Sequence, residues 1–384
     1  MTARPLDGVR VVDLSSFVAG PTAGRMLAEL GADVIRVDPI GGAVDGGRWP
    51  LTDEGASLYW TGLNQAKRSV AVDLRSDEDR ARVVELIADA GIVLENAAHA
   101  PWLAHDTLAE HRADLIHLHI AGNADGSPAV DYTVNAAAGV PLMTGPTGLG
   151  TPVNHVLPAW DLLTGVHAAL GIVAALRRRE QTGEGAYLEL ALDDVANSAV
   201  ASMGWLAEAQ ARGSGRELQG NALYGSYGSE FATADGRYVM IVGLTRGQWR
   251  ALVEVTGTAD VFTALAVQRG LDFENDGDRY AARDAITAIL APWFSARTFE
   301  QVEADLAGTR VLWAPYRTMD EVAADLAARP DSVVQYVDQP GIGSVLTARS
   351  PLRWNGRYTD ARPAPRHGQH TDEILGVDQL PGAR

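Results

Sequence analysis

The stretch from Pro158 to Leu190 constrains the fold most, because it joins a long apolar helix to a strand through a tight turn. Within residues 164–179, apolar side chains recur at helical spacing and most other positions are alanine, glycine or isoleucine, so the pattern predicts a helix buried on most sides. The turn TGEG at 182–185 leads into residues 186–192, which alternate with the period of two typical of a strand.

Asp161 lies just before this helix. At or near a helix N-cap, free backbone N–H groups and the positive end of the helix dipole hold a carboxylate ionised. Three arginines at 177–179 complement the opposite end of the helix. An aspartate in this position is usually only a cap, so local physics leaves a structural and a chemical interpretation of Asp161 open.

Composition limits the classes of function. A chain of 384 residues with 46% hydrophobic residues is long enough for two domains, or for one large domain with an insertion. The absence of cysteine excludes disulfides, thiolate catalysis and thiolate-bound metals. A net charge of -17 disfavours nucleic acid and anionic membranes as partners. The N-terminal residues lack the apolar run of a signal peptide, so we expect a cytoplasmic protein that acts neither on nucleic acid nor at a membrane.

The first 120 residues alternate between strand and helix patterns. Residues 9–14, 22–30 and 32–38 read as strand, helix and strand, a βαβ unit whose ligand crevice lies at the carboxyl ends of its strands. The connecting loop has neither a dinucleotide-binding fingerprint nor a phosphate-binding P-loop, so no NAD or ATP site is predicted. Further strands are expected at 70–74, 92–95 and 115–120, and a helix is expected at 77–90. The pattern predicts an α/β doubly wound sheet.

His117 and His119 share one face of their strand, without a third ligand nearby. We therefore expect structural histidines and no metal site.

The second half of the chain has a different organisation. One long helix is expected over 193–211, and the glycine-rich residues 212–228 are typical of a linker or flap. From about residue 229, a hairpin at 230–242 is followed by helices at 246–256, 279–291 and 298–307, which predicts a smaller α+β domain over 229–328.

Seven segments, taken together, resemble one known family. They are PLDGVRVVDLSSFVAGP (5–21), LAELGADVIRVD (27–38), LNQAKRSVAVDL (63–74), IVLEN (92–96), WDLLTGVHAALGIVAALRRREQTGEG (160–185), TADGRYVMIVG (233–243) and GQHTDEILG (368–376). They span nearly the whole chain in the order of the family III CoA-transferases, the group that includes formyl-CoA and carnitine CoA-transferases and the α-methylacyl-CoA racemases.

The resemblance implies a domain layout and an assembly. A large Rossmann-like domain would be formed from both chain ends, 1–200 and 329–384, with 201–228 as linker and 229–328 as the small middle domain. Two subunits would be interlocked like linked rings, which makes a homodimer the expected assembly.

The resemblance also implies the chemistry of Asp161. It matches the catalytic aspartate of the pattern G-D-x-x-T-G, with Trp160 in place of the usual glycine. A carboxylate there attacks a thioester carbonyl to give a mixed anhydride, then an aspartyl-CoA thioester, from which CoA passes to a carboxylic acid. CoA and acyl-CoA would be substrates, and no permanently bound cofactor is expected. Oxyanions would be stabilised by N–H groups at the helix start or by a substrate loop containing Tyr224, Gly225 and Gly228.

A nucleotide site is implied by the same family pattern. Its residues would be Val18, Ala19, Arg36, Lys67, Arg68 and Asn96. The three cations are candidates for binding the phosphates of CoA or stacking on its adenine, because an acidic protein must meet those phosphates locally. Lys67 is the only lysine of the chain. Pro39 stands where the family usually has arginine, so adenine packing is expected to differ.

Two alternatives remain open at this stage. A racemase needs a second base to pair with the aspartate. That histidine would precede Asp131, where this chain has Val130, and the supporting glutamate would fall near Arg246, so racemisation would need His155 or His167 as substitute. A CoA-binding protein without turnover is the second alternative, because Trp160 and the polar loop 121–128 depart from the family pattern. The leading hypothesis is an acyl-CoA:carboxylate CoA-transferase.

Overall fold

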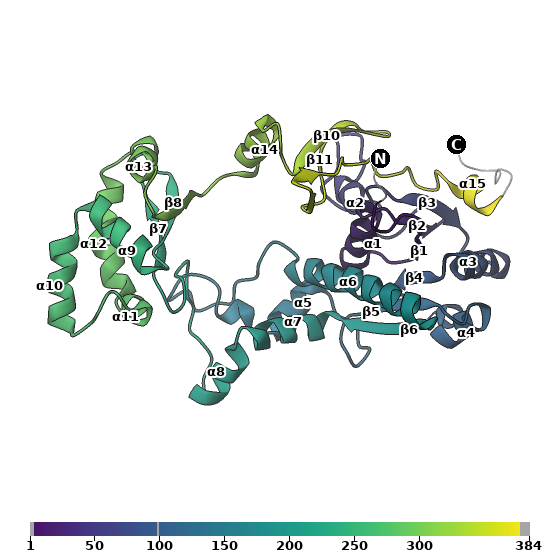
Figure 1. Ribbon diagram of the computed structural model, residues 1–384, viewed down its shortest axis with the longest axis horizontal. Helices are drawn as coiled ribbons and strands as arrows, with labels where there is room; N and C mark the ends of the chain where they lie inside the picture. The colour runs from purple at the N-terminus through teal and green to yellow at the C-terminus, as the bar shows by residue number, and fades with distance from the viewer. Residues whose placement is uncertain (1–3, 98–99, 377–384) are drawn as a thin grey trace. The chain divides into compact units, whose positions relative to one another are not determined.

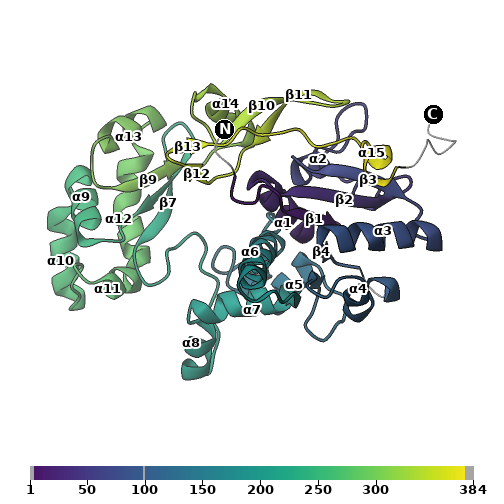
Figure 2. The same cartoon turned by 45° about the vertical axis from the view of Figure 1, so that its right-hand side comes forward.

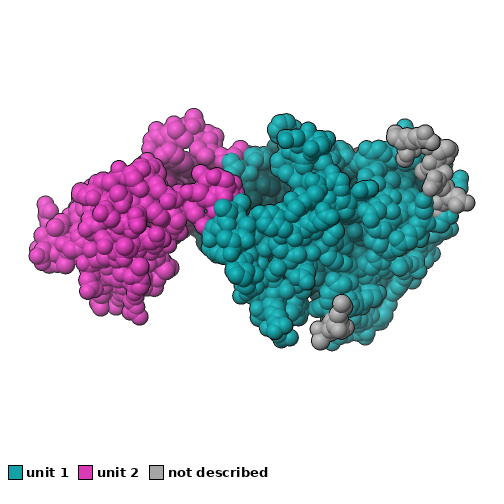
Figure 3. Space-filling model, turned by 90° about the horizontal axis from the view of Figure 1, so that it is seen from above, with its two compact units in different colours: residues 1–138, 155–207, 323–384 teal, residues 139–154, 208–322 magenta. Residues whose placement is uncertain are grey.

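The computed structural model describes residues 4–97 and 100–376 and divides into two compact units (Figure 3). Unit 1 contains residues up to 138, 155–207 and the residues from 323 onwards, so it draws on both ends of the chain. Unit 2 contains residues 139–154 and 208–322.

Unit 1 is built on a six-stranded parallel sheet with the order β3-β2-β1-β4-β5-β6 (Figure 1). Its strands are β1 (Arg10–Asp13), β2 (Asp33–Pro39), β3 (Arg68–Val72), β4 (Ile92–Glu95), β5 (Ile116–Ala121) and β6 (Ala186–Ala191). The predicted α/β fold with a parallel sheet is confirmed. Strand order reverses between β1 and β4, and the crevice beyond the carboxyl ends of such a pair is where doubly wound sheets bind ligands.

Helices cover both faces of this sheet, which explains why its strands are apolar on both sides. Val11 and Val34 belong to the core shared with α1 (Ala19–Glu29) and α6 (Ala159–Thr182). Their neighbours along the same two strands belong to the opposite core, which is shared with α3 (Asp77–Ala90).

The close packing of α1 and α6 depends on small residues. A Cβ atom added at Gly165 would lie 2.7 Å from the carbonyl oxygen of Ala19, so glycine permits the contact. Among the described residues, α6 is the one helix long and apolar enough to cross a membrane by composition, with a mean hydropathy of 1.6. Core helices of soluble proteins have the same composition, and the packing of α6 on α1 gives it that role in unit 1.

The chain end returns to the sheet beside β3. The backbone N–H of His370 donates to the carbonyl oxygen of Ser69 at 2.8 Å, just before α15 (Thr371–Leu375). Figure 2 shows α15 beside β3. The remaining elements that lie wholly within unit 1 are α2 (Leu58–Leu63), η1 (Pro101–Leu103), α4 (His105–His111), α5 (Asp131–Ala137), α7 (Leu192–Ser202), β10 (Val334–Gln339), β11 (Gly343–Ala348), β12 (Arg353–Trp354) and β13 (Arg357–Tyr358).

Unit 2 combines a three-stranded antiparallel sheet with a group of helices. They are η2 (Val140–Leu142), β7 (Gly228–Ala232), β8 (Tyr238–Val242), α9 (Arg246–Thr256), α10 (Ala259–Arg269), α11 (Asp276–Ala281), α12 (Arg283–Ser295), α13 (Phe299–Leu306) and β9 (Leu312–Pro315). Trp249, Phe262 and Phe294 lie in its buried core. Two further helices cross the unit boundaries, α8 (Trp205–Arg212) and α14 (Met319–Ala328).

Two helix predictions were wrong in detail, and several helices were not predicted. The single helix expected over 193–211 is broken into α7 and α8, because Gly204 adopts a positive φ of 76°. The helix expected at 279–291 is instead two helices, α11 and α12, which meet at Ala282. Helices α2, α10 and α15 were not predicted.

Candidate active site

Asp161 lies in the first turn of α6, where Pro158 is the N-cap. The expectation that the helix starts at residue 164 with Asp161 near its cap was therefore wrong. The capping oxygen comes from Asp131, whose Oδ2 accepts hydrogen bonds from the backbone N–H groups of Trp160 (2.8 Å) and Asp161 (3.2 Å). A carboxylate thirty residues away in sequence therefore neutralises this helix end.

Asp131 is held by contacts on its other side as well. It is buried at the start of α5, and its Oδ1 lies 2.8 Å from Nε2 of His155. The indole Nε1 of Trp160 donates to Oδ1 of Asn135 at 3.0 Å. These contacts fix the beginnings of α5 and α6 against each other, so Asp161 has a defined position.

The pKa of the Asp161 carboxyl is raised to about 7, first by burial and then by the charge of Asp131, while Arg48 acts in the opposite direction. The expectation that the helix end keeps Asp161 ionised is corrected by this result. The nearest N–H groups are already taken by Asp131, which adds repulsion instead. The carboxyl oxygens of Asp161 accept no hydrogen bond from any residue within 4–97 and 100–376, so they are available to a reacting group.

Arg48, Phe17 and Tyr59 are grouped near Asp161. The guanidinium carbon of Arg48 lies 5.4 Å from the ring centres of both Phe17 and Tyr59. Burial raises the pKa of Tyr59 to about 12, so its hydroxyl keeps its proton at neutral pH. Arg48 acts in the opposite direction, and the charges of Asp45 and Asp161 add to the rise. Sequence reasoning missed these three residues. The available signal was an arginine in a glycine-rich segment directly after a parallel strand, where ligand-binding loops lie.

Three residues predicted to bind the nucleotide meet at the strand reversal. Val18 and Ala19 are buried at the start of α1, which follows β1. Asn96 directly follows β4, and its side chain accepts from the N–H of Ser16 (3.0 Å) and donates to the Ser16 carbonyl (3.1 Å). The structure therefore brings Val18, Ala19 and Asn96 to one edge of the sheet.

Arg36 and Lys67 are buried cations that already have anionic partners. Nε of Arg36 lies 2.8 Å from Asp38, and Nζ of Lys67 lies 2.8 Å from Asp13. A phosphate would have to displace these carboxylates to reach either cation, and their role in CoA binding stays a prediction.

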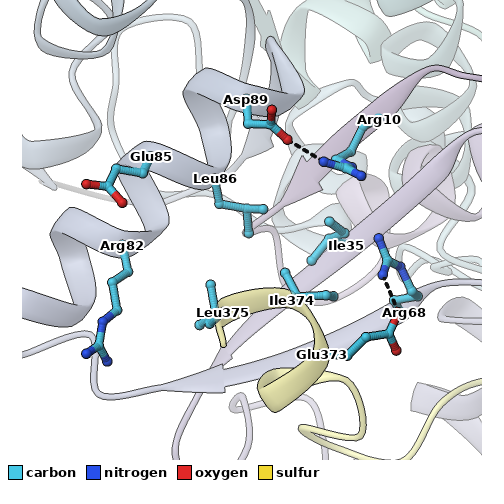
Figure 4. A pocket seen from close by; sticks show the side chains of 10 residues that line it. All are labelled: Arg10, Ile35, Arg68, Arg82, Glu85, Leu86, Asp89, Glu373, Ile374 and Leu375. Atoms are coloured by element: carbon cyan, nitrogen blue, oxygen red, sulfur yellow. Dashed lines mark hydrogen bonds and ion pairs between the residues drawn. The ribbon is translucent and has the colours of Figure 1, made fainter. Parts of the chain in front are cut away.

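Arg68 lies in a different region. Its guanidinium binds Asp33, the first residue of β2, whereas Asn96 follows the last residue of β4. In a parallel sheet these positions lie at opposite ends of the strands, the amino ends and the carboxyl ends. Arg68 lines a cavity of about 320 Å³ together with Arg10, Arg82 and residues of α3 and α15 (Figure 4). Each of these three arginines already forms ion pairs with carboxylates of the protein.

The predicted substrate loop belongs to unit 2. The ring of Tyr224 lies 3.6 Å from the guanidinium carbon of Arg216, and its hydroxyl contacts Glu208. Gly225 has a positive φ of 77°, and Gly228 begins β7. The role of this loop stays a prediction.

The paired histidines bind one carboxylate. Oε1 of Glu95 lies 3.1 Å from His117 and 2.6 Å from His119. Although burial acts in the opposite direction, these hydrogen bonds lower the pKa of Glu95 to about 2. No group of three or more possible ligands is arranged to hold a metal ion in the described part of the chain.

His167 is exposed, and its Nδ1 lies 2.9 Å from the carbonyl oxygen of Leu163.

Comparison with known proteins identifies similar sequences and structures. The chain is 48% identical to the 2-methylfumaryl-CoA isomerase of Chloroflexus aurantiacus, over 96% of this chain and 92% of that protein. It is 31% identical to the succinyl-CoA:mesaconate CoA-transferase of Haloarcula marismortui, over 97% of each. A crystal structure of a CAIB/BAIF family protein from Brucella suis is similar with a TM-score of 0.81 at 26% identity, covering 98% of this chain and 99% of that one.

The family profile gives the same result over almost the full length. The description CoA-transferase family III matches residues 6–371, a range that contains Asp161 and the whole of unit 2. With a match of this length, the chain belongs to CoA-transferase family III.

Proposed function

We propose that the protein transfers CoA between carboxyl groups, with Asp161 as the nucleophile. The observation that carries the proposal is the carboxyl of Asp161 itself, which is half-buried, fixed at the start of α6 and free of hydrogen bonds from the described residues. Asp161 is poorly explained as a helix cap, because the carboxylate of Asp131 already accepts the hydrogen bonds at this helix end.

The proposed reaction proceeds through covalent intermediates. An Asp161 oxygen attacks the thioester carbon, the C–S bond breaks, and a mixed anhydride and CoA thiolate form. The thiolate attacks the Asp161 carbonyl, which releases the first carboxylate and leaves an aspartyl-CoA thioester. An acceptor carboxylate then attacks, and the same two steps in reverse return the new acyl-CoA and free Asp161. No proton is gained or lost overall.

A second candidate is the same chemistry within one molecule, and the 48% identity to a 2-methylfumaryl-CoA isomerase favours it. The acid named there is an unsymmetrical dicarboxylic acid, so its two mono-CoA thioesters are isomers. Formation of the aspartyl-CoA thioester releases the substrate as the free diacid. The diacid then attacks this thioester with its other carboxylate. The result is an isomerisation that needs no residue beyond those of transfer.

The racemase alternative needs a second base that faces the substrate. His155 contacts Asp131 beside this site, but that contact already uses its Nε2. Incubation of an acyl-CoA in D₂O without an acceptor acid distinguishes the mechanisms, because deuterium at Cα would be gained by racemisation and not by CoA transfer.

Trapping the covalent intermediate tests the proposal and the alternative without turnover together. After incubation with succinyl-CoA, we expect mass spectrometry to find CoA attached to the peptide that contains Asp161. Hydroxylamine added during incubation should convert Asp161 to its hydroxamate. A protein that binds CoA and forms neither product would contradict the proposal.

The pH dependence of transfer provides an independent prediction. The attacking form of Asp161 is the carboxylate, so kcat/KM should rise with pH through an apparent pKa near 7. Asp131→Asn removes the neighbouring negative charge, lowers the pKa of Asp161 and should move this rise to lower pH by about one unit. Tyr59, whose pKa is raised to about 12, does not contribute to this rise.

His155 is the necessary control, because it binds the same Asp131 carboxylate. His155→Gln should keep the rise near pH 7. Loss of the rise in that variant, or an unmoved profile in Asp131→Asn, would assign the titration to a group other than Asp161.

We further propose a homodimer with interlocked subunits and the CoA nucleotide near Val18, Ala19 and Asn96. Exposed apolar side chains on α6 support an interface, since Val166 is 44% and Leu170 63% exposed. Light scattering checks the assembly, and a monomer mass would contradict it.

The cytoplasmic location predicted from the sequence stays a prediction.

A further inference from the structure

We infer that Arg48 binds the non-reacting carboxylate of the substrate, which makes this site selective for dicarboxylic acids and their mono-CoA thioesters. The inference rests on the proposed function, since it names the class of acid that the same site accepts. It assigns a role to a residue of the loop after β2, between Pro39 and α2.

The guanidinium of Arg48 is an uncompensated cation in an acidic protein. The chain has 49 acidic and 32 basic residues, yet no carboxylate within residues 4–97 and 100–376 forms an ion pair or a hydrogen bond with this side chain. The nearby acid Asp45 is already used, because its carboxylate binds Arg36 (3.3 Å) and accepts from the N–H of Phe17 (2.8 Å). The five N–H groups of Arg48 therefore remain available to an anion.

The position of Arg48 is fixed from three directions. Its carbonyl oxygen accepts a hydrogen bond from Oγ of Ser57 at 2.6 Å, and its guanidinium lies 5.4 Å from the ring centres of Phe17 and Tyr59. Contact with aromatic rings attracts and orients a planar guanidinium. Phe17 has a positive φ of 68°, a conformation that its N–H donation to Asp45 helps to hold. An anion-binding group is thus held in place before a ligand arrives.

Arg48 and Asp161 interact electrostatically without forming an ion pair. Arg48 lies over the ring of Phe17, two residues before Ala19, and the Ala19 carbonyl packs against Gly165, one turn after Asp161 in α6. The guanidinium is therefore near the start of α6, and no ion pair occupies it there. A dicarboxylic acid matches this arrangement, with one carboxyl group at Asp161 and the other on the guanidinium. Arginine binds a carboxylate through two parallel hydrogen bonds, and a monocarboxylic acid leaves both unmade.

The test compares two acids of equal length that differ in the second carboxylate. We would measure the exchange of labelled succinate into succinyl-CoA and of labelled butyrate into butyryl-CoA. The wild-type protein should strongly prefer succinate. In Arg48→Gln, kcat/KM for succinate should fall by about 100-fold, mainly through KM, because a charge-assisted bidentate contact is lost. Butyrate exchange should change less than about threefold, since an acid without a second carboxylate makes no such contact.

Two further variants control for charge and for folding. Arg48→Lys keeps the charge and should recover part of the succinate activity without the bidentate geometry. Arg177→Gln removes an exposed arginine near the far end of α6 and should behave as wild type. Equal losses for succinate and butyrate in Arg48→Gln, or a weaker Kd for CoA itself, would overturn the inference, the second result assigning Arg48 to a CoA phosphate.

Failure of the inference can be told apart from failure of the proposed function. If the wild-type protein exchanges acids and forms the Asp161 adduct but Arg48→Gln keeps its preference for succinate, only the role of Arg48 is lost. If the wild-type protein forms no adduct and exchanges neither acid, the proposed function fails, and this inference fails with it.

Discussion

Replacing Asp161 with asparagine should abolish CoA transfer and, at the same time, make the protein more stable at alkaline pH. Asparagine keeps the size of the side chain but cannot form the mixed anhydride, so we expect kcat to fall by about 10⁴-fold or more, as for other catalytic nucleophiles. The transfer assay and a thermal melt of the same preparation check the two effects.

The sign of the stability change follows from the pKa of Asp161. Its carboxyl has an ordinary pKa near 3.8 in the unfolded chain and about 7 in the folded protein, because burial and Asp131 disfavour its charge. Below pH 4 both states hold the proton, and Asp161 has no effect. Between pH 4 and 7 the unfolded chain releases the proton first, so the folded state becomes progressively less favoured. Above pH 7 the penalty is constant, and a difference of this size between the two pKa values corresponds to a few kcal/mol.

Asparagine carries no such penalty. The Tm of Asp161→Asn should therefore match wild type at pH 4, exceed it increasingly up to pH 7, and keep that advantage at pH 8. A helix-capping role for Asp161 would give the opposite result, a lower Tm above pH 4. Asp106→Asn, which changes an exposed aspartate in the first turn of α4, is the matched control and should alter neither activity nor stability appreciably.

Regular segments of unit 1 were predictable from the sequence because their signals are local. Helix α3 begins after the capping residue Ser76 and ends at Gly91 in a left-handed conformation, and its predicted bounds 77–90 are those observed. The fold class followed from the alternation of such segments.

The environment of Asp161 could not be predicted in this way. The carboxylate that caps α6 belongs to Asp131, and the cation that acts on Asp161 is Arg48, more than one hundred residues away in sequence. Nothing in the local pattern around residues 158–190 indicates either partner. The residue itself was found through the family pattern, whereas its raised pKa depends on tertiary contacts that only the fold creates.

Lys67 illustrates the same limit for a buried cation. In sequence it is a lone lysine beside an arginine, a pattern that suggested phosphate binding. In the structure its side chain is buried, and Nζ donates to Asp13 (2.8 Å), Asn64 (2.9 Å) and the carbonyl of Pro21 (3.0 Å), which uses all three of its donors. A Cβ atom added at Gly24 would lie 2.6 Å from the Asp13 carboxylate, so glycine gives this ion pair its space.

Lys67→Met should therefore destabilise unit 1 strongly, by about 3–5 kcal/mol, because Asp13 would keep a buried charge without its main partner. Although burial acts in the opposite direction, Lys67 and Arg36 hold the pKa of Asp13 below its ordinary value. Without Lys67 that pKa rises, so the loss of stability should be greatest at neutral pH and shrink as the pH is lowered and Asp13 takes up a proton. Urea or thermal unfolding over a range of pH measures this.

The double variant Asp13→Asn/Lys67→Met separates a structural role of Lys67 from a role in CoA binding. With both charges removed, most of the lost stability should return, because no buried charge is left unpaired. We expect this variant to bind CoA with a Kd close to that of wild type, since all donors of Lys67 are used within the protein. A Kd raised about tenfold or more in the restabilised double variant would instead show that Lys67 leaves Asp13 to contact a phosphate when CoA binds.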